Sequence, residues 1–500
     1  MAVYPNQPLP VTGSILYNFI ACPHRIHLDA AGDPSMRDEV SPFVAMLWER
    51  GTRYEREVIQ GLSIRFTDLT EIDADDKERA TLEAMVRGDS IIYGGRIQAD
   101  GLVGMPDVLR KSGDKYVPGD IKSGAGEEEG GDGDSKPKIP YAVQLALYVD
   151  VLERIGLSAG RRAFVWDVHG QEVEYDLERP QGQRNPRSLW SHYEAAREAA
   201  TQVLAGTAVT KPASSANCKQ CHWHSYCLDQ LVATDDLTLI PQLGRALRDT
   251  MFDEIPTVRE LSTINPEAFA RGKNKTVFSG VGPDSLRKFQ ARALMLSTPG
   301  ARPALTAPIS LVRKPRELFF DIEVDPLRDL CYLHGIVERL NGDNETERFV
   351  AFFMEDETAE AERKAFADAF AYLTADPNAV IYYWSKYERT RYRLLQAKYP
   401  DVCTAAEIEA LFDPTTAIDL LYDVVTKATE WPTYDRSIKT LAKFLGFNWR
   451  DTHPSGAASI QWFDEWVRLR DPAMKQRILD YNEDDCIATR VVLDGILDLT

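Results

Sequence analysis

Four cysteines that lie far apart in the sequence constrain the fold more than any other feature. Cys22 stands near the N-terminus, and Cys218, Cys221 and Cys227 follow much later with the spacing Cys-x2-Cys-x5-Cys. In a chain without a dense disulfide framework, closely spaced cysteines indicate metal or redox chemistry. If all four bind one metal group, the fold must return the late cluster to the neighbourhood of Cys22.

Length and composition limit the class of protein. A chain of 500 residues exceeds the size at which one core stops growing, about 250–300 residues, so more than one domain is expected. Hydrophobic residues make up 44% of the chain, yet no apolar run of about 18 residues predicts a transmembrane helix. The N-terminus lacks the basic and apolar segments of a signal peptide, so we expect a cytoplasmic protein without a membrane partner.

Charge is informative in one region of the chain. The net charge of −19 argues against a protein that coats nucleic acid without specificity. It does not exclude a nuclease, because metal-binding carboxylates are acidic and phosphate contacts need only a local basic face. Residues 271–292 supply such a face, in which one acid, Asp284, stands among these basic residues: Arg271, Lys273, Lys275, Arg287, Lys288 and Arg292.

Composition along the chain predicts three blocks. Residues 1–230 contain the four spaced cysteines, residues 231–300 hold short helical patterns, and residues 313–500 open with a strand-like run. Several prolines between residues 297 and 315 indicate a linker. Within the first block, residues 123–138 are rich in Gly and Glu and predict a flexible acidic loop beside a candidate site.

A first group of acids belongs to a predicted strand meander over residues 91–121. Asp120 and Lys122 are two residues apart, so in a strand their side chains share one face of the sheet. Asp107 belongs to the preceding strand and can approach that face. With a third acid, Glu55, on a predicted helix upstream, these carboxylates could hold Mg²⁺ or Mn²⁺, and Lys122 could orient a water molecule and offset developing charge.

The order of these motifs resembles the RecB-like branch of the PD-(D/E)XK nuclease superfamily. Gly-x-x-x-Glu, Gly-x-x-Asp and Asp-x-Lys are followed by Gln-x-x-x-Tyr, whose Gln and Tyr share one face of a predicted helix. The resemblance covers about the first 230 residues and implies a restriction-endonuclease-like domain. The active-site residues that it implies are Glu55, Asp107, Asp120, Lys122, Gln144 and Tyr148, with Glu55, Asp107 and Asp120 as metal ligands.

The cysteines are similar to those of the iron–sulfur nucleases in that branch, which have one early cysteine and three late ones. The resemblance implies a [4Fe–4S] cluster that joins the ends of the domain and is held by Cys22, Cys218, Cys221 and Cys227. His222 and His224 lie within the late group, so zinc bound by Cys and His is the alternative. Spacing alone does not separate the two metals.

Pro118, just before Asp120, departs from the family pattern. Because proline has no N–H to donate to a strand ladder, we predict that this strand is bulged or lies at a sheet edge there.

The middle block contains Gly-x-Gly between two short helical patterns, at Gly280–Gly282. Glycines at such a turn let backbone N–H groups approach phosphate closely. The pattern resembles helix-hairpin-helix modules, which hold the DNA backbone without reading sequence. A helical spacer is the alternative.

A second group of acids follows the apolar run Phe319-Phe320. Asp321 and Glu323 share one face of a predicted strand, and Asn341-Gly342 predicts the turn of the next hairpin. Tyr481 and Asp485 are four residues apart on a predicted C-terminal helix.

This second order resembles the RNase H-like 3′–5′ exonucleases of the DEDDy type, in which four acids hold two metal ions and a tyrosine positions water. The acids would be Asp321, Glu323, Glu388 and Asp485, with Tyr481 as the tyrosine and Asp321, Glu323 and Asp485 as the metal ligands. The family has Asp where Glu388 stands, which leaves either a variant exonuclease or a fold with weakened chemistry. Asp419 is another candidate acid. Cys331, Cys403 and Cys486 are interpreted as small buried hydrophobes.

The sequence therefore predicts a multidomain α/β protein with a PD-(D/E)XK domain, a small helix-hairpin-helix-like region and an RNase H-like mixed-sheet domain. The expected activity is metal-dependent hydrolysis of DNA single strands or ends at two sites, in repair, recombination or defence. The chain lacks a Gly-x-x-x-x-Gly-Lys-Ser/Thr motif, so a helicase would act in trans. A nucleic-acid-binding scaffold with inactive folds and an RNA-directed nuclease are the alternatives.

Overall fold

The computed structural model describes residues 9–40, 42–62, 64–129, 135–182, 186–326, 328–452 and 454–499. The chain divides into two compact units. The N-terminal unit comprises Met1–Pro212 and Ala216–Leu228, and the C-terminal unit comprises Ala213–Ser215 and Asp229–Thr500. Helices in the described ranges do not combine the length and apolar character needed to cross a membrane.

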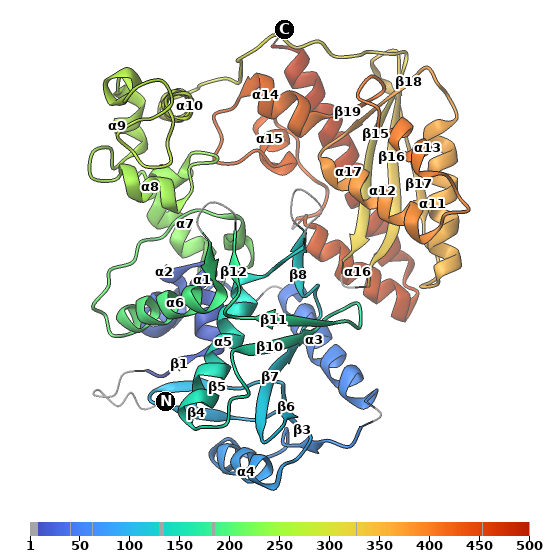
Figure 1. Ribbon diagram of the computed structural model, residues 1–500. Coiled ribbons are helices and arrows are strands. Elements are labelled where there is room, and N and C mark those ends of the chain that lie inside the picture. Colours follow the sequence, from blue (N-terminus) through green and yellow to red (C-terminus); the bar gives the residue numbers. More distant parts are fainter. Residues whose placement is uncertain are drawn as a thin grey trace. The chain divides into compact units, whose positions relative to one another are not determined.

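A six-stranded mixed sheet in the order β11-β10-β7-β6-β3-β2 forms the centre of the N-terminal unit (Figure 1). Its strands are β2 (Thr67–Asp68), β3 (Ile91–Tyr93), β6 (Val108–Ser112), β7 (Lys115–Ile121), β10 (Arg162–Trp166) and β11 (Glu172–Asp176). A smaller sheet, β1-β5-β4, consists of β1 (Val11–Thr12), β4 (Ile97–Ala99) and β5 (Leu102–Gly104). β12 (Pro180–Gln181) and β13 (Arg187–Ser188) form a further short antiparallel pair.

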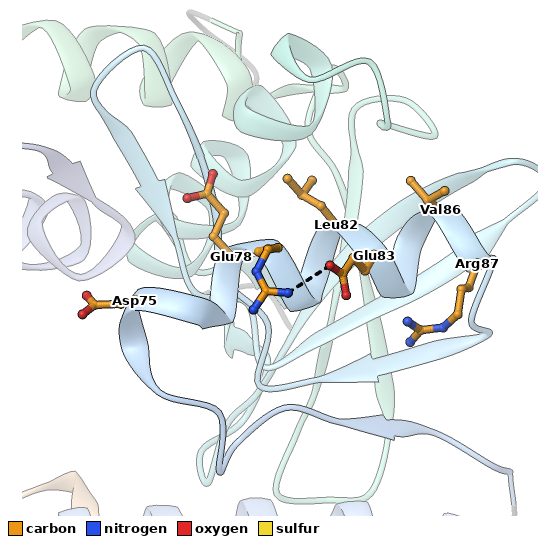
Figure 2. Close-up of a pocket in the computed structure, with 7 residues that line it drawn as sticks. Asp75, Glu78, Leu82, Glu83, Val86 and Arg87 are labelled. Carbon is orange, nitrogen blue, oxygen red and sulfur yellow. Dashed lines mark hydrogen bonds and ion pairs between the residues drawn. The ribbon is translucent and has the colours of Figure 1, made fainter.

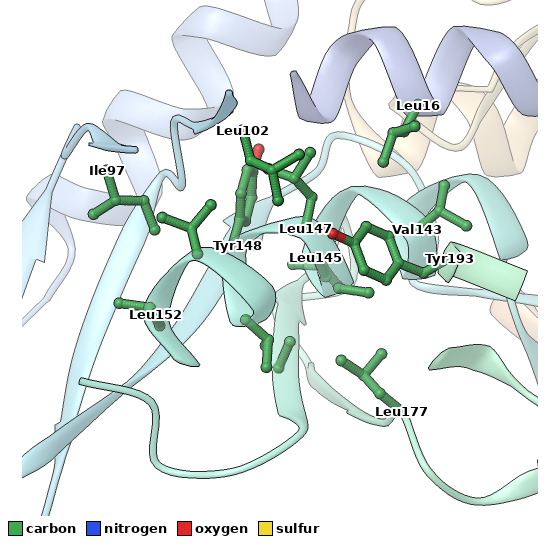
Figure 3. Packing of buried hydrophobic residues seen from close by; sticks show 14 of the residues in the cluster. Leu16, Ile97, Leu102, Val143, Leu145, Leu147, Tyr148, Leu152, Leu177 and Tyr193 are labelled. Carbon is green, nitrogen blue, oxygen red and sulfur yellow. The ribbon is translucent and has the colours of Figure 1, made fainter. Parts of the chain in front are cut away.

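Helix α5 is buried on almost every side because it packs against the sheets and against two other helices. Apolar residues on different sides of this helix, such as Val143, Leu145, Leu147 and Leu152, are fully buried (Figure 3). A helix that is apolar all round requires such an interior position. The helices of the unit are α1 (Gly13–Ala21), α2 (Pro23–Ala31), α3 (Pro42–Gln60), α4 (Ala74–Arg87), α5 (Ile139–Arg154), α6 (Leu189–Leu204) and the start of α7 (His224–Ala233).

The prediction that the strand at Pro118 is bulged or at an edge is wrong. β7 is an interior strand, and Leu109 faces Pro118 in an unbroken ladder with β6. The backbone N–H groups of Tyr116 and Lys122 point away from β6, toward Leu157 and Trp166. Residue 118 is an even number of positions from both, so an N–H there would also point away from β6. The ladder with β10, on that side, begins only at Gly119. The missing N–H therefore falls where no ladder bond is needed.

The prediction of a loop over residues 123–138 also needs correction. Strands β8 (Glu127–Glu129) and β9 (Ser135–Pro137) pair in antiparallel register, so the two flanks of this segment form a hairpin. Residues 130–134, the most glycine-rich part of the predicted loop, lie outside the described residues.

A five-stranded mixed sheet in the order β17-β16-β15-β18-β19 forms the centre of the C-terminal unit (Figure 1). β15 (Arg316–Asp325), β16 (Leu330–Leu340) and β17 (Asp343–Phe353) are antiparallel, whereas β18 (Ala379–Tyr383) and β19 (Ala417–Asp419) run parallel to β15. The predicted turn at Asn341-Gly342 is confirmed. Both residues have positive φ, as a two-residue hairpin turn requires.

The two faces of β15 are covered by different helices. Its even-numbered residues, such as Leu318 and Phe320, enter a core with α11, α12 and α13. The opposite, odd-numbered face carries Asp321 and Glu323 and meets α17. The helices of this region are α11 (Ala359–Thr374), α12 (Lys386–Lys398), α13 (Ala405–Leu411), α14 (Thr426–Ala428), α15 (Ile438–Phe444), α16 (Gly456–Leu469) and α17 (Pro472–Leu497).

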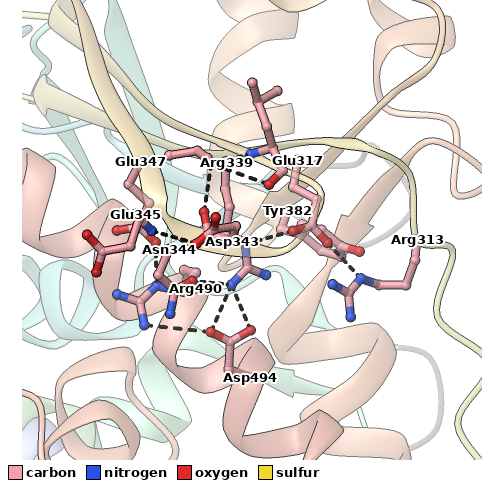
Figure 4. A network of polar contacts seen from close by, with 12 residues as sticks. Arg313, Glu317, Arg339, Asp343, Asn344, Glu345, Glu347, Tyr382, Arg490 and Asp494 are labelled. Atoms are coloured by element: carbon pink, nitrogen blue, oxygen red, sulfur yellow. Dashed lines mark hydrogen bonds and ion pairs between the residues drawn. The ribbon is translucent and has the colours of Figure 1, made fainter.

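A buried polar network fixes α17 on the sheet (Figure 4). Arg339 on β16 donates to Glu317 on β15 at 2.7 Å and to Asp494 on α17 at 2.9 Å. Arg313 reaches the other oxygen of Glu317 at 2.6 Å. Glu317 is fully buried, so this pairing is needed to hold its charge and sets the position of α17.

The middle block lies in the C-terminal unit and contains α8 (Arg245–Met251), α9 (Val258–Thr263) and α10 (Pro283–Ser297). A short pair, β14 (Ala304–Leu305) with β20 (Thr429–Glu430), ties the proline-rich segment to the rest of the unit. The predicted basic face is smaller than expected. Arg292 is only 4% exposed and pairs with Glu430, and Arg287 pairs with Glu267 and Asp284, so these two charges are largely neutralised.

Candidate active sites

The C-terminal unit brings three carboxylates together at the centre of its sheet. One oxygen from each of Asp321, Glu323 and Asp485 lies within 4.8 Å of the others. β15 supplies the first two and α17 supplies the third, as the predicted strand and helix spacings imply. Oxygen donors in this number and proximity fit a divalent cation such as Mg²⁺ or Mn²⁺. Burial raises the pKa of Glu323 to about 8, and the charge of Asp485 adds to this shift.

Asn482 fixes the first of these acids. Its Nδ2 donates to Asp321 Oδ2 at 2.7 Å, and its side chain is fully buried. The space for it exists because residue 335 on β16 is glycine: a Cβ there would lie 1.6 Å from Asn482 Oδ1. On the other side of the group, Trp449 Nε1 donates to Asp485 Oδ1 at 2.7 Å.

Lys439 on α15 is a neighbour of this site that sequence reasoning missed. Its Nζ donates to Tyr481 Oη and to the Pro454 carbonyl, both at 2.8 Å. Because an ammonium can only donate, the Tyr481 hydroxyl proton points elsewhere, and Asp485 is its hydrogen-bond partner. No spacing within the sequence connects Lys439 with Tyr481, so only the fold could reveal the pair.

The N-terminal unit gathers its acids at the paired strands β6 and β7. Lys122 Nζ lies 2.9 Å from Asp120 Oδ2, and Asp120 is only 1% exposed. Asp107 accepts a hydrogen bond from the Ile121 N–H at 2.8 Å, while its own N–H donates to Asp120 Oδ1 at 3.4 Å. Asp120 thus meets the Lys122 ammonium through Oδ2 and the Asp107 N–H through Oδ1.

The charge of Glu55 affects the protonation of Asp107. Burial and the Asp120 charge raise the pKa of Asp107 well above its usual range; Lys122 opposes this shift and Glu55 adds to it. Glu55 also forms a hydrogen bond with Tyr93 on the neighbouring β3. Burial alone would lower the pKa of Lys122, but the Asp120 and Asp107 charges outweigh it and raise that pKa, so the lysine stays protonated.

Gln144 and Tyr148 meet as their helical spacing predicts. Gln144 Nε2 donates to Tyr148 Oη at 2.8 Å on the inner face of α5. Tyr148 lies against Gly104, where a Cβ would come within 2.8 Å of its ring. The glycine of the Gly-x-x-Asp motif thus leaves room for the tyrosine of the last motif.

Comparison with protein families gives the two units their classes. A model of the PD-(D/E)XK nuclease superfamily matches residues 29–228, and a model of the RNase H superfamily matches residues 318–496. The chain carries two nuclease-superfamily domains. Neither the curated proteins nor the solved structures contain a match to the chain. The predicted fold class, a multidomain α/β protein with these two domain types, is confirmed.

In the RNase H domain, Glu388 lies outside the group of three carboxylates. It stands in the first turn of α12, and its carboxylate accepts backbone N–H groups of Glu388 itself and of Ser385 and Trp384, which precede the helix. Burial raises its pKa to about 8, with a contribution from Asp419, and its charge in turn acts on Asp321. One oxygen, Oε2, has no hydrogen-bond partner. Asp419 caps the turn after β19 through the Tyr422 N–H at 2.9 Å.

In the PD-(D/E)XK domain, the structure places the segment after Cys22 beside the late cysteines. Asp29 Oδ1 is hydrogen-bonded to His222 Nε2 at 2.7 Å and to Trp223 Nε1 at 2.9 Å. Burial raises the pKa of Cys221, and the charges of Cys22 and Cys218 add to this shift, so these thiols are neighbours. His222 is engaged by Asp29 and His224 is exposed at the start of α7.

A surface hollow lies along α4 (Figure 2). It is lined by one helix face with Leu82 and the exposed Val86 among charged side chains, and Arg79 pairs there with Glu83 at 3.1 Å. It contains none of the predicted site residues.

Proposed function

We propose that the chain is a metal-dependent nuclease with two hydrolytic sites that acts on DNA single strands or ends. The observation that carries the proposal is the group formed by Asp321, Glu323 and Asp485 at the centre of the RNase H domain. A second acidic group with its own lysine, in the PD-(D/E)XK domain, supports a second site.

In the RNase H domain, Asp321, Glu323 and Asp485 would hold Mg²⁺ or Mn²⁺, with Glu388 as a fourth acid. A divalent ion at such a site lowers the pKa of bound water and offsets charge on the phosphate. Asn482 keeps the Asp321 carboxylate turned toward the group. Tyr481, whose hydroxyl is oriented by Lys439, would position the attacking water.

In the PD-(D/E)XK domain, Asp107, Asp120 and Glu55 would hold the ion. Lys122 stays protonated beside Asp120 and would offset negative charge that develops on the scissile phosphate. Gln144 and Tyr148 support this site from α5.

We also propose that Cys22, Cys218, Cys221 and Cys227 hold a [4Fe–4S] cluster that joins the ends of this domain. The proximity of three of these thiols and the Asp29 contacts support a shared site. Thiolates suit both iron–sulfur clusters and zinc. Metal analysis of the purified chain tests the choice: iron with visible absorbance, both lost in Cys218→Ala, supports the cluster, whereas stoichiometric zinc replaces it.

The nuclease proposal is tested by hydrolysis of end-labelled DNA and RNA, single- and double-stranded, with Mg²⁺ or Mn²⁺ and with EDTA. Wild type is compared with Asp120→Ala, Asp321→Ala and the double variant. Loss in both single variants, and complete loss in the double, supports two sites. If wild type hydrolyses no substrate, the scaffold alternative replaces the nuclease. If only Asp120→Ala abolishes activity, the RNase H domain is a retained fold, as the placement of Glu388 would favour. Preference for RNA would favour the RNA-directed alternative.

A further inference from the structure

Two stacked tyrosines border the proposed active site of the PD-(D/E)XK domain. Tyr17 on α1 and Tyr141 on α5 have ring centroids 6.1 Å apart and an interplanar angle of 23°. The Tyr141 ring centroid is 5.7 Å from Lys122 Nζ, which in turn lies 2.9 Å from Asp120 Oδ2. The aromatic pair is therefore next to the proposed catalytic lysine, on the face of the sheet that α5 covers.

A second ammonium group lies against the same ring. Lys138 Nζ is 5.2 Å from the Tyr141 ring centroid and is held by the Ala125 carbonyl at 2.8 Å. Aromatic rings with adjacent cations are the combination that proteins use for single-stranded nucleic acid, since a base stacks on the ring and the backbone meets the charge.

The contact between α1 and α5 is made by other side chains, so it does not require an exposed tyrosine at position 17. Leu16, the neighbour of Tyr17, is fully buried and joins the same core as the apolar residues of α5. Tyr17 itself remains 38% exposed, and Tyr141 is half-buried. Tyr141 packs partly against that core, so the exposed ring of Tyr17, stacked on Tyr141, is the flat apolar surface left beside the acidic site.

We propose that Tyr17 and Tyr141 form a stacking platform for an unpaired base adjacent to the scissile phosphate, so that this site takes single-stranded nucleic acid. The inference rests on the proposed nuclease function and specifies its substrate class. In a duplex each base is already stacked on its neighbours, and reaching the platform would require unstacking. DNA and RNA carry the same base chemistry, so both belong in the test.

Binding without hydrolysis provides the direct test. The full chain with Asp120→Ala and Asp321→Ala is titrated with single-stranded DNA and RNA that contain 2-aminopurine, and with the matching duplexes. We expect Tyr17→Ala and Tyr141→Leu to weaken single-strand binding about tenfold or more and to remove the stacking-dependent quenching of 2-aminopurine. Tyr17→Phe and Tyr141→Phe keep the rings and should bind as before. Tyr434→Ala, which removes an exposed tyrosine in the other unit, is the matched control.

The outcomes separate this inference from the nuclease proposal. A loss confined to single strands, spared by the Phe variants, supports the platform, and the DNA and RNA titrations show which polymer binds. Unchanged single-strand binding in Tyr17→Ala and Tyr141→Leu, or an equal loss for duplexes, overturns it. Hydrolysis by the chain with only Asp321→Ala is measured in parallel. If this chain hydrolyses nucleic acid while the binding results contradict the platform, the nuclease proposal holds and only the platform is rejected. Circular dichroism checks that Tyr141→Leu is folded, and Tyr17→Ala tests the platform at an exposed position.

Discussion

Asn482 and Asp321 are 161 residues apart in sequence, yet Asn482 Nδ2 donates to Asp321 Oδ2 at 2.7 Å inside the RNase H domain. The bond joins α17 to β15 at the point where three carboxylates meet. It is possible because Gly335 leaves the space that the amide occupies. The orientation of one proposed metal ligand thus depends on a glycine in a neighbouring strand.

Gly335→Ala should destabilise the RNase H domain. The new Cβ would lie 1.6 Å from Asn482 Oδ1, so α17 or β16 must shift, and overpacking of this kind costs about 1–3 kcal/mol or more. Urea denaturation of the full chain measures the loss. Gly456→Ala is the control because a Cβ there meets nothing within 4 Å. Equal stability of the two variants would contradict the close contact.

Lys439→Met should slow hydrolysis by the RNase H domain without unfolding it. The variant removes the donor that orients the Tyr481 hydroxyl, and a bond to a charged group contributes about 1.5–3 kcal/mol, or roughly ten- to hundredfold in rate. Rates are measured in an Asp120→Ala background to isolate this site.

Lys427→Met, at a lysine that is 67% exposed, is the matched control for this prediction. If Lys439 acts through Tyr481, adding Tyr481→Phe to Lys439→Met should cost less than the two single effects combined. Fully additive effects would show that the lysine acts elsewhere.

Burial of His334 should destabilise the C-terminal unit as the pH drops below 6.5, whereas the raised pKa values of Glu323 and Glu388 act in the opposite direction. His334 is fully buried, and burial lowers its pKa from 6.5 to about 3. The unfolded chain therefore binds a proton below pH 6.5 that the folded chain excludes, so unfolding becomes easier by about 1.4 kcal/mol per pH unit between 6.5 and 3. Above pH 6.5 the histidine is mostly neutral in both the folded and the unfolded chain, so this destabilisation is absent.

Hydrogen exchange of β16 at a series of pH values measures this dependence. His334→Gln keeps a partner for the Tyr392 hydroxyl, which lies 3.1 Å from the histidine, and should gain stability relative to wild type as the pH falls below 6.5. His169→Gln, at an exposed histidine of the other unit, should show no such gain. An identical slope in His334→Gln would assign the acid sensitivity to other groups.

Asp29→Ala should loosen the contact between the segment after Cys22 and the late cysteines. It removes hydrogen bonds to His222 and to the fully buried Trp223, and a buried donor left without a partner costs about 1–3 kcal/mol. Thermal unfolding and the metal content of the purified variant are the measurements. Asp114→Ala, at an exposed turn, serves as control. Unchanged metal retention would show that the cysteine site does not depend on Asp29.

Local periodicity predicted the parts of each site that belong to one element. Asp120 and Lys122 share a strand face, and Gln144 and Tyr148 share a helix face, as their spacings require. The same reasoning failed at Pro118, because proline's effect depends on which neighbouring ladder its missing N–H would have served. It also overestimated the basic face at residues 271–292, since Arg292 is buried against Glu430.

The sequence by itself determined the residue types, their order and their parity on strands and helices, because these follow from covalent spacing and backbone geometry. Only the tertiary structure decided that Asn482 reaches Asp321, that Lys439 orients Tyr481 and that Tyr17 stacks on Tyr141. The position of Glu388 is likewise set by the start of α12, which the motif order alone did not predict. Such contacts join elements that are distant in the chain, and packing between those elements, which no local pattern encodes, brings their side chains together.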